Sequence, residues 1–379
     1  MQLSVIILNY NVRYFLEQCV CSVQKALENI DGEIIVVDNN SQDNSCVMMK
    51  QRFPEVTLIE NKENLGFPKG NNIGVSNAKG EFICILNPDT VVAEDTFIKV
   101  LAFAKKQVDL GIIGVKLIDG TGNFLPESKR GIPTPWVAFT KITGLYKIFP
   151  KISLFNQYYA QNLSENTTGK VAILVGAFMV MKRDLYTEIG GFDENCFMYS
   201  DDIDLSYMAL KKEKYNYYYP ETTIIHYKGE STIKDGAYMK RFREAMNFFY
   251  KKHFKVSLVF SVFMELGILF FAFVKMFQGK SKLKLSSKIY LLISDNDNLR
   301  KRVEVKINQK VILHKNFDSF SFATNTEIIF DQNYTDFKSI IKAFETNKNN
   351  HFTFKILSKS DDFIIGSDSS FDRGEIIKI

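Results

Sequence analysis

The sequence predicts an α/β fold with a mostly parallel central sheet, followed by an apolar helical segment and a small second α/β domain. Over residues 1–90, short apolar runs alternate with stretches of helical period, which is the pattern of a parallel sheet covered by helices. Several of these runs end in an acidic or amide residue, as strands do when their ends line a site. With 379 residues, 46% of them hydrophobic, the chain can form one large domain or two ordinary ones.

The first strands are predicted by four apolar runs, at 3–8, 34–37, 56–59 and 82–86. Apolar residues recur at helical spacing from Leu16 to Ile30, and a further helix is expected over 71–78. Because ligands bind beyond the carboxyl ends of parallel strands, we expect Asp38 and Asp89 to face one crevice.

Residues 118–170 have a different composition, with four of the eight prolines among many aromatic residues and lysines. This composition indicates either an irregular, partly mobile region that contacts an acceptor or an ordinary surface excursion, and the sequence leaves the two open. Regular structure is expected again in a strand at 174–181.

Residues 257–277 are almost wholly apolar and long enough to cross a bilayer, which takes about 20 residues. Glu265 lies in the middle, where a charge is costly, and lysines flank both ends, so the positive-inside rule selects no orientation. We expect a helix lying on the inner leaflet, held by lysines on anionic lipid. A single membrane span and a helix buried against the C-terminal part are the alternatives.

The beginning of the chain and its cysteines predict the compartment. No basic segment of a signal peptide precedes the first strand, and the five cysteines show no zinc-type spacing. We expect reduced core thiols in a cytoplasmic protein, peripheral to the inner face of the cell membrane. The net charge of +5 is mild, and no nucleic-acid partner is expected.

The C-terminal part alternates again between strand-like and helical patterns. A strand at 289–293, a hairpin at 303–313 and a helix at 336–346 between strands at 327–330 and 352–357 predict a small α/β domain. The expected organisation is therefore a catalytic domain at 1–250, a membrane-associating segment at 251–285 and an accessory domain of unknown role at 286–379.

Two acidic clusters and one histidine carry the predicted chemistry. Asn87-Pro88-Asp89-Thr90 closes a strand, and Asp201-Asp202-Ile203-Asp204 and His226 follow later. A carboxylate at a strand end suits a metal ligand, and a second acidic cluster supplies a base for a hydroxyl nucleophile. Neither a G-x-G-x-x-G spacing nor a Walker lysine pattern is present, which disfavours a dehydrogenase or a P-loop enzyme.

Eight motifs, in a fixed order over about 230 residues, resemble the inverting family 2 glycosyltransferases of the GT-A fold, which is Rossmann-like, and specifically their rhamnosyltransferase-like branch. The C-terminal hundred residues lie outside the resemblance. The motifs are Val5-Ile6-Ile7-Leu8-Asn9-Tyr10-Asn11, Val36-Val37-Asp38-Asn39-Asn40-Ser41, Asn64-Leu65-Gly66-Phe67, Asn71-Asn72, Asn87-Pro88-Asp89-Thr90, Gly190-Gly191-Phe192-Asp193-Glu194, Asp202-Ile203-Asp204-Leu205 and His226.

The resemblance implies a role for each matched position. Asp202 corresponds to the catalytic base, and Asp204 orients the base or contacts the acceptor. Asp89 and His226 would hold a divalent cation, Mn²⁺ or Mg²⁺. The residues that would bind the donor are Asn9, Asn11, Asp38, Asn64, Gly66, Lys69, Asn72 and Asn87.

Three departures and three alternatives accompany these assignments. Asn87 stands where the family often has a first aspartate, Asp201 where it usually has glutamate, and Met208 where relatives commonly carry arginine. Three of these sites also have a purely structural interpretation. Asp38 could cap a helix, the acidic cluster could be the start of a helix, and His226 could be a hydrogen-bonded structural histidine.

The predicted function is an inverting glycosyltransferase. It would move rhamnose or a similar hexose from a nucleotide-diphosphate sugar to a hydroxyl of a growing, lipid-linked surface glycan by metal-assisted single displacement. One alternative is a degenerate nucleotide-sugar-binding scaffold in a glycan-assembly complex. A sugar nucleotidyltransferase is disfavoured, because the first strand leads into no glycine-rich basic loop.

Overall fold

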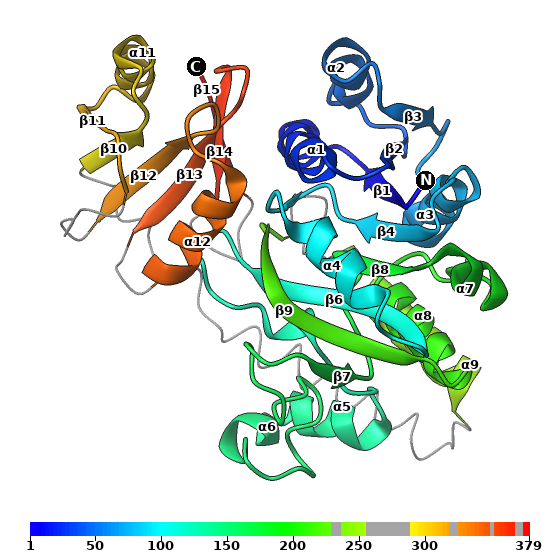
Figure 1. Ribbon diagram of the computed structural model, residues 1–379. Coiled ribbons are helices and arrows are strands. Elements are labelled where there is room, and N and C mark those ends of the chain that lie inside the picture. Colours follow the sequence, from blue (N-terminus) through cyan, green and yellow to red (C-terminus); the bar gives the residue numbers. More distant parts are fainter. Residues whose placement is uncertain (229–235, 255–288, 318–324, 349–351, 368–373) are drawn as a thin grey trace.

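The computed structural model contains two β-sheets, one in each part of the chain (Figure 1). It describes residues 1–228, 236–254, 289–317, 325–348, 352–367 and 374–379. Within these ranges, the first sheet has nine strands and the second has six. The predicted α/β class with a mostly parallel central sheet and a smaller second sheet is confirmed. The boundaries at 250 and 285 stay predictions, and the predicted membrane-associating helix at 257–277 lies outside the described residues.

The first half of the larger sheet is parallel, in the order β3-β2-β1-β4, and each predicted apolar run forms its strand. The predicted helix at 71–78 begins earlier, at Gly66, so the expected donor loop is partly the first turn of a helix. These elements are β1 (Leu3–Asn9), α1 (Arg13–Leu27), β2 (Gly32–Asp38), α2 (Ser45–Arg52), β3 (Thr57–Glu60), α3 (Gly66–Ser76) and β4 (Phe82–Leu86).

The second half of this sheet is mixed. β8 pairs antiparallel with β4 and β6, whereas β6 runs parallel to β9, the long strand that ends at His226. The strand expected at 174–181 begins only at Phe178. The residues before it turn away from the sheet, because the Gly176 N–H donates to the Asp202 carboxylate at the start of a helix. The elements are β5 (Thr90–Val91), α4 (Thr96–Ala104), β6 (Leu110–Ile118), β7 (Gly169–Val171), β8 (Phe178–Lys182), α7 (Arg183–Glu188), α8 (Asp201–Lys211), β9 (Tyr215–His226) and α9 (Gly236–His253).

Helices cover both faces of the larger sheet and bury two separate apolar cores. Side chains of α1, α2 and α4 pack with one face, around Leu16, Met48 and Phe97. Side chains of α3, α7 and α8 pack with the other, around Val75 and Leu205. Helices on both faces leave the strand ends as the places where polar groups converge. All five cysteines are free.

The proline-rich stretch between β6 and β7 contains little regular structure, as expected. It is fixed at its base by backbone bonds, with Arg130 paired to Ile173 and the Gly131 N–H donating to the Gln157 oxygen at 3.0 Å. Its elements are a 3₁₀ turn η1 (Pro126–Ser128) and two helices, α5 (Pro135–Ile142) and α6 (Leu145–Ile148), drawn at the bottom of Figure 1.

The second sheet has the strand order β11-β10-β12-β13-β14-β15, parallel from β11 to β13. The hairpin predicted at 303–313 is wrong: Asn296 caps a helix there, and the strand after it runs parallel to β10. Val303 faces the core while Val305 is 82% exposed, so the apolar alternation did not mark a strand. The elements are β10 (Ile289–Ile293), α11 (Asp297–Ile307), β11 (Val311–His314), β12 (Thr326–Asp331), α12 (Phe337–Asn347), β13 (Thr353–Leu357), β14 (Phe363–Gly366) and β15 (Glu375–Lys378).

A further apolar core lies between the two sheets and contains side chains from both parts of the chain. Phe15 and Tyr227 from the first part pack in one cluster with Phe330 and Phe344 from the second. Within the described ranges, no helix is both long and apolar enough to cross a membrane.

Candidate active site

The carboxyl ends of β1 and β2 hold a buried amide–carboxylate pair. Asn9 Nδ2 donates to Asp38 Oδ2 at 2.7 Å, and the Ser41 N–H donates to Asp38 Oδ1 at 2.8 Å. Asn11 follows with a φ of +55° and donates its N–H to Ser41 Oγ at 2.9 Å. Asp38 does not cap α2, since Asn44 occupies the N-cap position of that helix. The capping alternative is therefore not supported, and the carboxylate shapes the strand-end turn.

Asn64 and Gly66 shape the start of α3. Asn64 Oδ1 accepts from the Gly66 N–H at 3.0 Å and from Asn39 Nδ2 at 3.2 Å, which ties this loop to the end of β2. Gly66 has a φ of +81°, and a Cβ there would lie 2.9 Å from the Phe197 carbonyl oxygen. Only glycine fits this close approach. Lys69 is exposed on the first turn and forms no ion pair within the part of the chain that the structure describes.

Asn72 lies on the same helix, but its amide is used within the protein. Its Nδ2 donates to the Phe192 oxygen and to Glu194 Oε1, each at 2.9 Å. Its Oδ1 accepts from Tyr186 Oη at 2.5 Å and from the Phe192 N–H at 3.1 Å. These bonds fasten the Gly190–Gly191 turn to α3, so donor binding by Asn72 stays a prediction without a free hydrogen-bonding group to support it.

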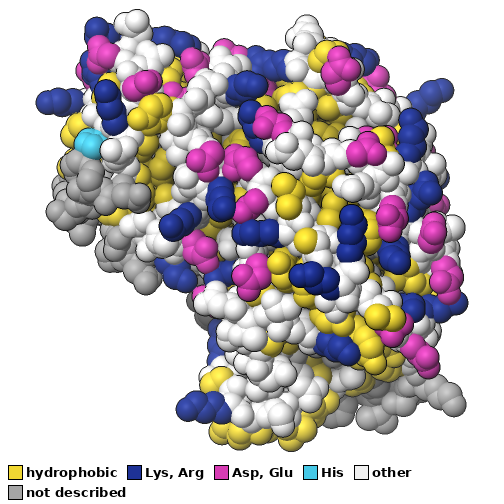
Figure 2. Space-filling view, in the orientation of Figure 1, with side chains coloured by type: hydrophobic (Ala, Val, Ile, Leu, Met, Phe, Trp, Pro, Cys, Tyr) yellow, Lys and Arg dark blue, Asp and Glu magenta, His cyan; other side chains and the backbone are white. Residues whose placement is uncertain are grey.

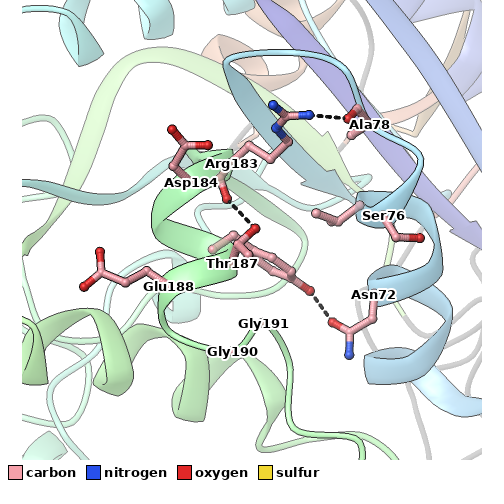
Figure 3. Close-up of a pocket in the computed structure, with 11 residues that line it drawn as sticks. Asn72, Ser76, Ala78, Arg183, Asp184, Thr187, Glu188, Gly190 and Gly191 are labelled. Atoms are coloured by element: carbon pink, nitrogen blue, oxygen red, sulfur yellow. Dashed lines mark hydrogen bonds between the residues drawn. The ribbon is translucent and has the colours of Figure 1, made fainter.

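A groove of about 730 Å³ lies beside Asn72, between α3 and α7 (Figure 3). Figure 3 shows Asn72, Arg183 and the Gly190–Gly191 turn around it. Of the predicted site residues, Asn72 alone lines this groove, which the acidic clusters and His226 do not reach. The groove is therefore separate from the predicted catalytic and metal-binding residues.

Asn87, Asp89 and His226 form the candidate metal site. β5 pairs antiparallel with β9, which places His226 opposite Thr90. His226 Nε2 lies 3.4 Å from Asp89 Oδ1 and 3.4 Å from Asn87 Nδ2. Asp89 Oδ1, Asn87 Oδ1 and His226 Nδ1 are buried and have no hydrogen-bond partner among the described residues. Buried polar atoms without partners mark a place where a ligand, ion or water is bound.

The chemistry of these donors fits a divalent cation. Carboxylate oxygen suits Mg²⁺ and Mn²⁺, and an imidazole ligand favours Mn²⁺. No third histidine, cysteine or carboxylate joins Asp89 and His226 in a metal cluster within the described ranges. A cation held here would therefore take its remaining ligands from the Asn87 amide, water or a phosphate.

Glu127 and Lys228 form a half-buried ion pair beside the histidine. Burial raises the pKa of Glu127, but the Lys228 ammonium and, more weakly, His226 outweigh it, and the net pKa lies below the ordinary value. Glu127 is therefore ionised at neutral pH and compensates the Lys228 charge next to the candidate metal site.

Asp202 lies in the first turn of α8, and its carboxylate is held by two partners. Arg130 Nη2 forms an ion pair with Asp202 Oδ2 at 2.5 Å, and the Gly176 N–H donates to the same oxygen at 3.1 Å. The Asp202 charge raises the pKa of Arg130 despite its burial. The neighbouring Ala177 oxygen accepts from the Asn87 N–H at 3.1 Å. One dipeptide thus joins the candidate base to the candidate metal site.

Asp201, the first residue of α8, has a strongly perturbed pKa. Burial, reinforced by the adjacent Asp202 charge, raises the pKa of Asp201 to about 7. A carboxyl with such a pKa is partly protonated at neutral pH, so the pair carries less than two negative charges.

Asp204 faces away from Asp202 and binds α9. Its Oδ2 accepts from Lys252 Nζ at 2.8 Å, and its Oδ1 lies 2.5 Å from His253 Nε2. Burial lowers the pKa of His253 despite this carboxylate. Both oxygens are engaged, so a direct catalytic role for Asp204 stays a prediction, whereas its contact with α9 is observed.

Sequence reasoning missed three residues at this site. Arg130 pairs with Asp202 across 72 positions, and no motif surrounds it in the proline-rich stretch. Glu127 lies in the same stretch. Asn39 lies within the motif that ends the second strand, and its amide joins β2 to the α3 loop. Arg130 is a single basic residue far from the acidic cluster in the sequence, so only the fold shows that the two lie side by side.

Comparison with known proteins identifies the family. Residues 4–190 match the glycosyl transferase family 2 profile. An N-acetylglucosaminyl-diphospho-decaprenol L-rhamnosyltransferase of Mycobacterium tuberculosis is 25% identical over 246 residues, which are 62% of this chain and 79% of the relative. A poly(ribitol-phosphate) beta-glucosyltransferase of Bacillus spizizenii is 31% identical over 134 residues, 34% of this chain and 21% of the relative.

Among solved structures, the mannosyltransferase PcManGT from Pyrobaculum calidifontis, in complex with GDP-Man and Mn²⁺, has a TM-score of 0.46 and 18% identity. The match covers 74% of this chain and 76% of that one. The ordered strand-end motifs and the family match agree. Residues 4–190 belong to glycosyl transferase family 2, and the protein is a glycosyl transfer enzyme of the GT-A fold.

Proposed function

We propose that the protein is an inverting glycosyltransferase that moves rhamnose or a similar hexose from a nucleotide-diphosphate sugar to a hydroxyl of a growing surface glycan. The observation that carries the proposal is the Gly176–Ala177 dipeptide, which bonds both to the Asp202 carboxylate and to Asn87 beside Asp89. A base and a diphosphate site so close together suit displacement at one carbon between them.

Donor binding would use the ends of β1, β2 and α3. The Asp38 carboxylate and the partnerless Asn9 Oδ1 offer acceptors for the N–H and O–H groups of a base and ribose. Asn11, Asn64 and Gly66 shape the adjoining loops, and the exposed Lys69 on α3 can reach phosphate oxygens. The Lys69 ammonium would compensate phosphate charge without first breaking an ion pair.

Asp202 would remove the acceptor's proton as its oxygen attacks the anomeric carbon from the face opposite the leaving diphosphate, which inverts the configuration. Arg130 keeps the Asp202 carboxylate in one orientation, and the α8 N-terminus favours its negative charge. A protonated Asp201 would limit the repulsion within the pair.

Asp89 and His226 would hold Mn²⁺ or Mg²⁺, with Asn87 beside them. The cation, when bound, neutralises negative charge on the departing nucleoside diphosphate. The three partnerless atoms of this cluster support the assignment.

The acceptor in this proposal is lipid-linked, as the name of the mycobacterial relative states for that protein. Catalysis would be carried by 1–250, at the inner face of the cell membrane. Nucleic acid has no place in the reaction.

The test is a panel of nucleotide-diphosphate sugars, scored by thermal shift and by release of nucleoside diphosphate, with and without Mn²⁺ or Mg²⁺. We expect one donor to give both a shift and metal-dependent release, and the Asp202→Asn variant to keep the shift and lose the release. A shift without release, even with lipid-linked acceptors, would instead support the scaffold alternative.

A further inference from the structure

The α5–α6 region exposes an unusual set of large apolar side chains. We propose that this surface, here named the α5–α6 surface, docks on an anionic lipid bilayer and so presents the active site to a lipid-linked acceptor. The inference rests on the proposed function for the acceptor alone, and the docking itself is independent of the reaction. The surface consists of Trp136, Phe139, Ile148, Phe149, Ile152 and Leu154.

Exposure is concentrated in this stretch. Of sixteen exposed large hydrophobic side chains in the described residues, six lie within the nineteen positions 136–154. Ile148 is 66% exposed and Leu154 is 52% exposed. Figure 2 shows hydrophobic side chains gathered along the lower edge, where Figure 1 places α5 and α6. A concentration of this kind marks a contact surface, whereas single exposed apolar residues are ordinary.

The aromatic rings form one connected group. The Trp136 ring lies 5.6 Å from that of Phe139 and 5.9 Å from that of Phe155, which in turn lies 5.3 Å from that of Phe149. Trp136 Nε1 also donates to the Leu154 oxygen at 2.9 Å. The surface is therefore pre-arranged, and docking would require little ordering of these side chains.

The charge of the stretch selects lipid over protein as the occupant. No aspartate or glutamate occurs between Glu127 and Glu165, and three lysines, at 141, 147 and 151, lie among the apolar side chains. Lys147 and Lys151 are exposed. Lysine is depleted in the core of protein–protein interfaces, whereas aromatic residues beside lysines suit the headgroup region of an anionic bilayer.

A short series of contacts connects this surface to the candidate base. Lys141, on α5, lies 3.7 Å from the centre of the Tyr158 ring. The Tyr158 backbone oxygen accepts from the Gly131 N–H at 3.1 Å, and Gly131 directly follows Arg130. Arg130 in turn holds Asp202. A bilayer beneath α5 and α6 would thus lie on the side of the molecule from which Arg130 reaches the base.

Helix α9 adds a second connection. Tyr250 Oη donates to the Pro133 oxygen at 2.7 Å, just before α5, and the last turn of α9 carries Lys251 and Lys252. Lys252 pairs with Asp193 and Asp204, whereas Lys251 is exposed. α9 is therefore fixed to the base of the α5–α6 region.

The experiment measures binding of the full chain to vesicles of phosphatidylcholine, with and without phosphatidylglycerol, in the absence of donor and acceptor. We expect binding only with the anionic lipid, and weaker binding at high salt. The double variant Lys147→Gln/Lys151→Gln should bind about twenty-fivefold more weakly, about fivefold for each lysine. Its matched control is Lys105→Gln/Lys106→Gln, which removes the same charge from an exposed site after α4 and should bind like the wild type.

A second pair of variants tests the apolar part. Ile148→Ser/Ile152→Ser should weaken binding about tenfold, because the buried apolar area on the membrane is lost. Val108→Ser/Val305→Ser, at positions 94% and 82% exposed elsewhere, should have no effect. Residues 255–288 are unchanged in every variant, so any difference arises from the substituted side chains.

Three outcomes would overturn the docking. They are equal binding of the wild type to neutral and anionic vesicles, unchanged binding of both α5–α6 variants, and loss of self-association by these variants in sedimentation without any vesicle binding. The last would make the surface an interface between copies of the chain. Donor turnover, measured separately with a soluble acceptor, should be unchanged in all four variants, so failure of the docking and failure of the proposed function are distinguishable.

Discussion

Both sheets contain parallel strands, but they differ at the edge where the carboxyl ends of these strands lie. The difference is whether the buried polar side-chain atoms at that edge have hydrogen-bond partners. At the edge of the first sheet, Asn9 Oδ1, Asn87 Oδ1 and Asp89 Oδ1 are buried without partners among the described residues. At the edge of the second, Asp331 accepts from Ser294 Oγ at 2.7 Å and from the Asn333 N–H at 2.8 Å. Within the described residues, no partnerless buried side-chain atom belongs to the second sheet's domain.

The second edge is also covered by the first domain. Gln332 contacts Gln18 of α1, and Arg52 of α2 pairs with both Glu17 and Asp362. Glu94 accepts from the first two N–H groups of α12, at 2.7 and 2.9 Å, and so occupies a helix N-terminus that is suited to an anion. One edge is therefore left open for a ligand, while the other is used as an interface.

Deletion of 286–379 is expected to have the largest effect. It would expose the apolar side chains of the core that the two sheets share, and the burial of each contributes about 1.5–3 kcal/mol to stability. The buried Glu17 would become exposed to solvent. We expect insoluble or unfolded protein, measured by circular dichroism and size-exclusion chromatography. A folded, monomeric and active fragment would show that the interface is dispensable.

The Asp202→Asn substitution should lower kcat by about 10³-fold, since a general base contributes roughly 10²–10⁴-fold, and leave donor affinity unchanged. The matched variant at the other edge is Asp331→Asn, which alters a buried, doubly bonded carboxylate. It should lower stability and leave kcat unchanged. Steady-state kinetics and donor titration check both, and equal losses of kcat would remove the distinction between the edges.

Asp201 should make stability depend on pH. The folded carboxyl titrates at about 7 and the unfolded one near its ordinary value of 3.8, so the folded state binds more protons between these values. The stabilisation is complete below about pH 4 and is lost as the pH rises to 7. Asp201→Asn removes this loss and should be more stable than the wild type by up to a few kcal/mol at pH 8.

Urea unfolding of both proteins at pH 4 and pH 8 measures this difference. Asp297→Asn, at an exposed carboxylate on α11, is the control and should show no such gain at pH 8. A stability difference between Asp201→Asn and the wild type that does not grow with pH would contradict the raised pKa.

The smallest expected effect is at the interface. Glu94→Gln keeps the shape and weakens two hydrogen bonds at the start of α12, which should lower stability by about 1 kcal/mol. Donor turnover should be unchanged, because Glu94 lies at the covered edge. Thermal unfolding and nucleotide release measure the two, and a loss of turnover would connect the accessory domain to catalysis.

Much of the first sheet could be predicted from the sequence. Buried parallel strands are continuous apolar runs, and the runs at 3–8, 34–37 and 82–86 each became a strand with its polar residue at the end. The second sheet was predicted less well. Val303 and Val305 alternate like strand residues, but the N-cap at Asn296 and the packing of Leu299 against the sheet decided for a helix.

By itself, the sequence determined which residue types end the strands, because hydrophobic period and polar termination are local properties. In the structure, Asp202 and Asp204 lie two positions apart on α8, about 200° around the helix axis, and so point apart. Only the tertiary structure decided their partners: Arg130 for Asp202, and Lys252 and His253 for Asp204. Such pairings depend on how distant segments pack, and a buried carboxylate takes whichever cation the fold brings within reach.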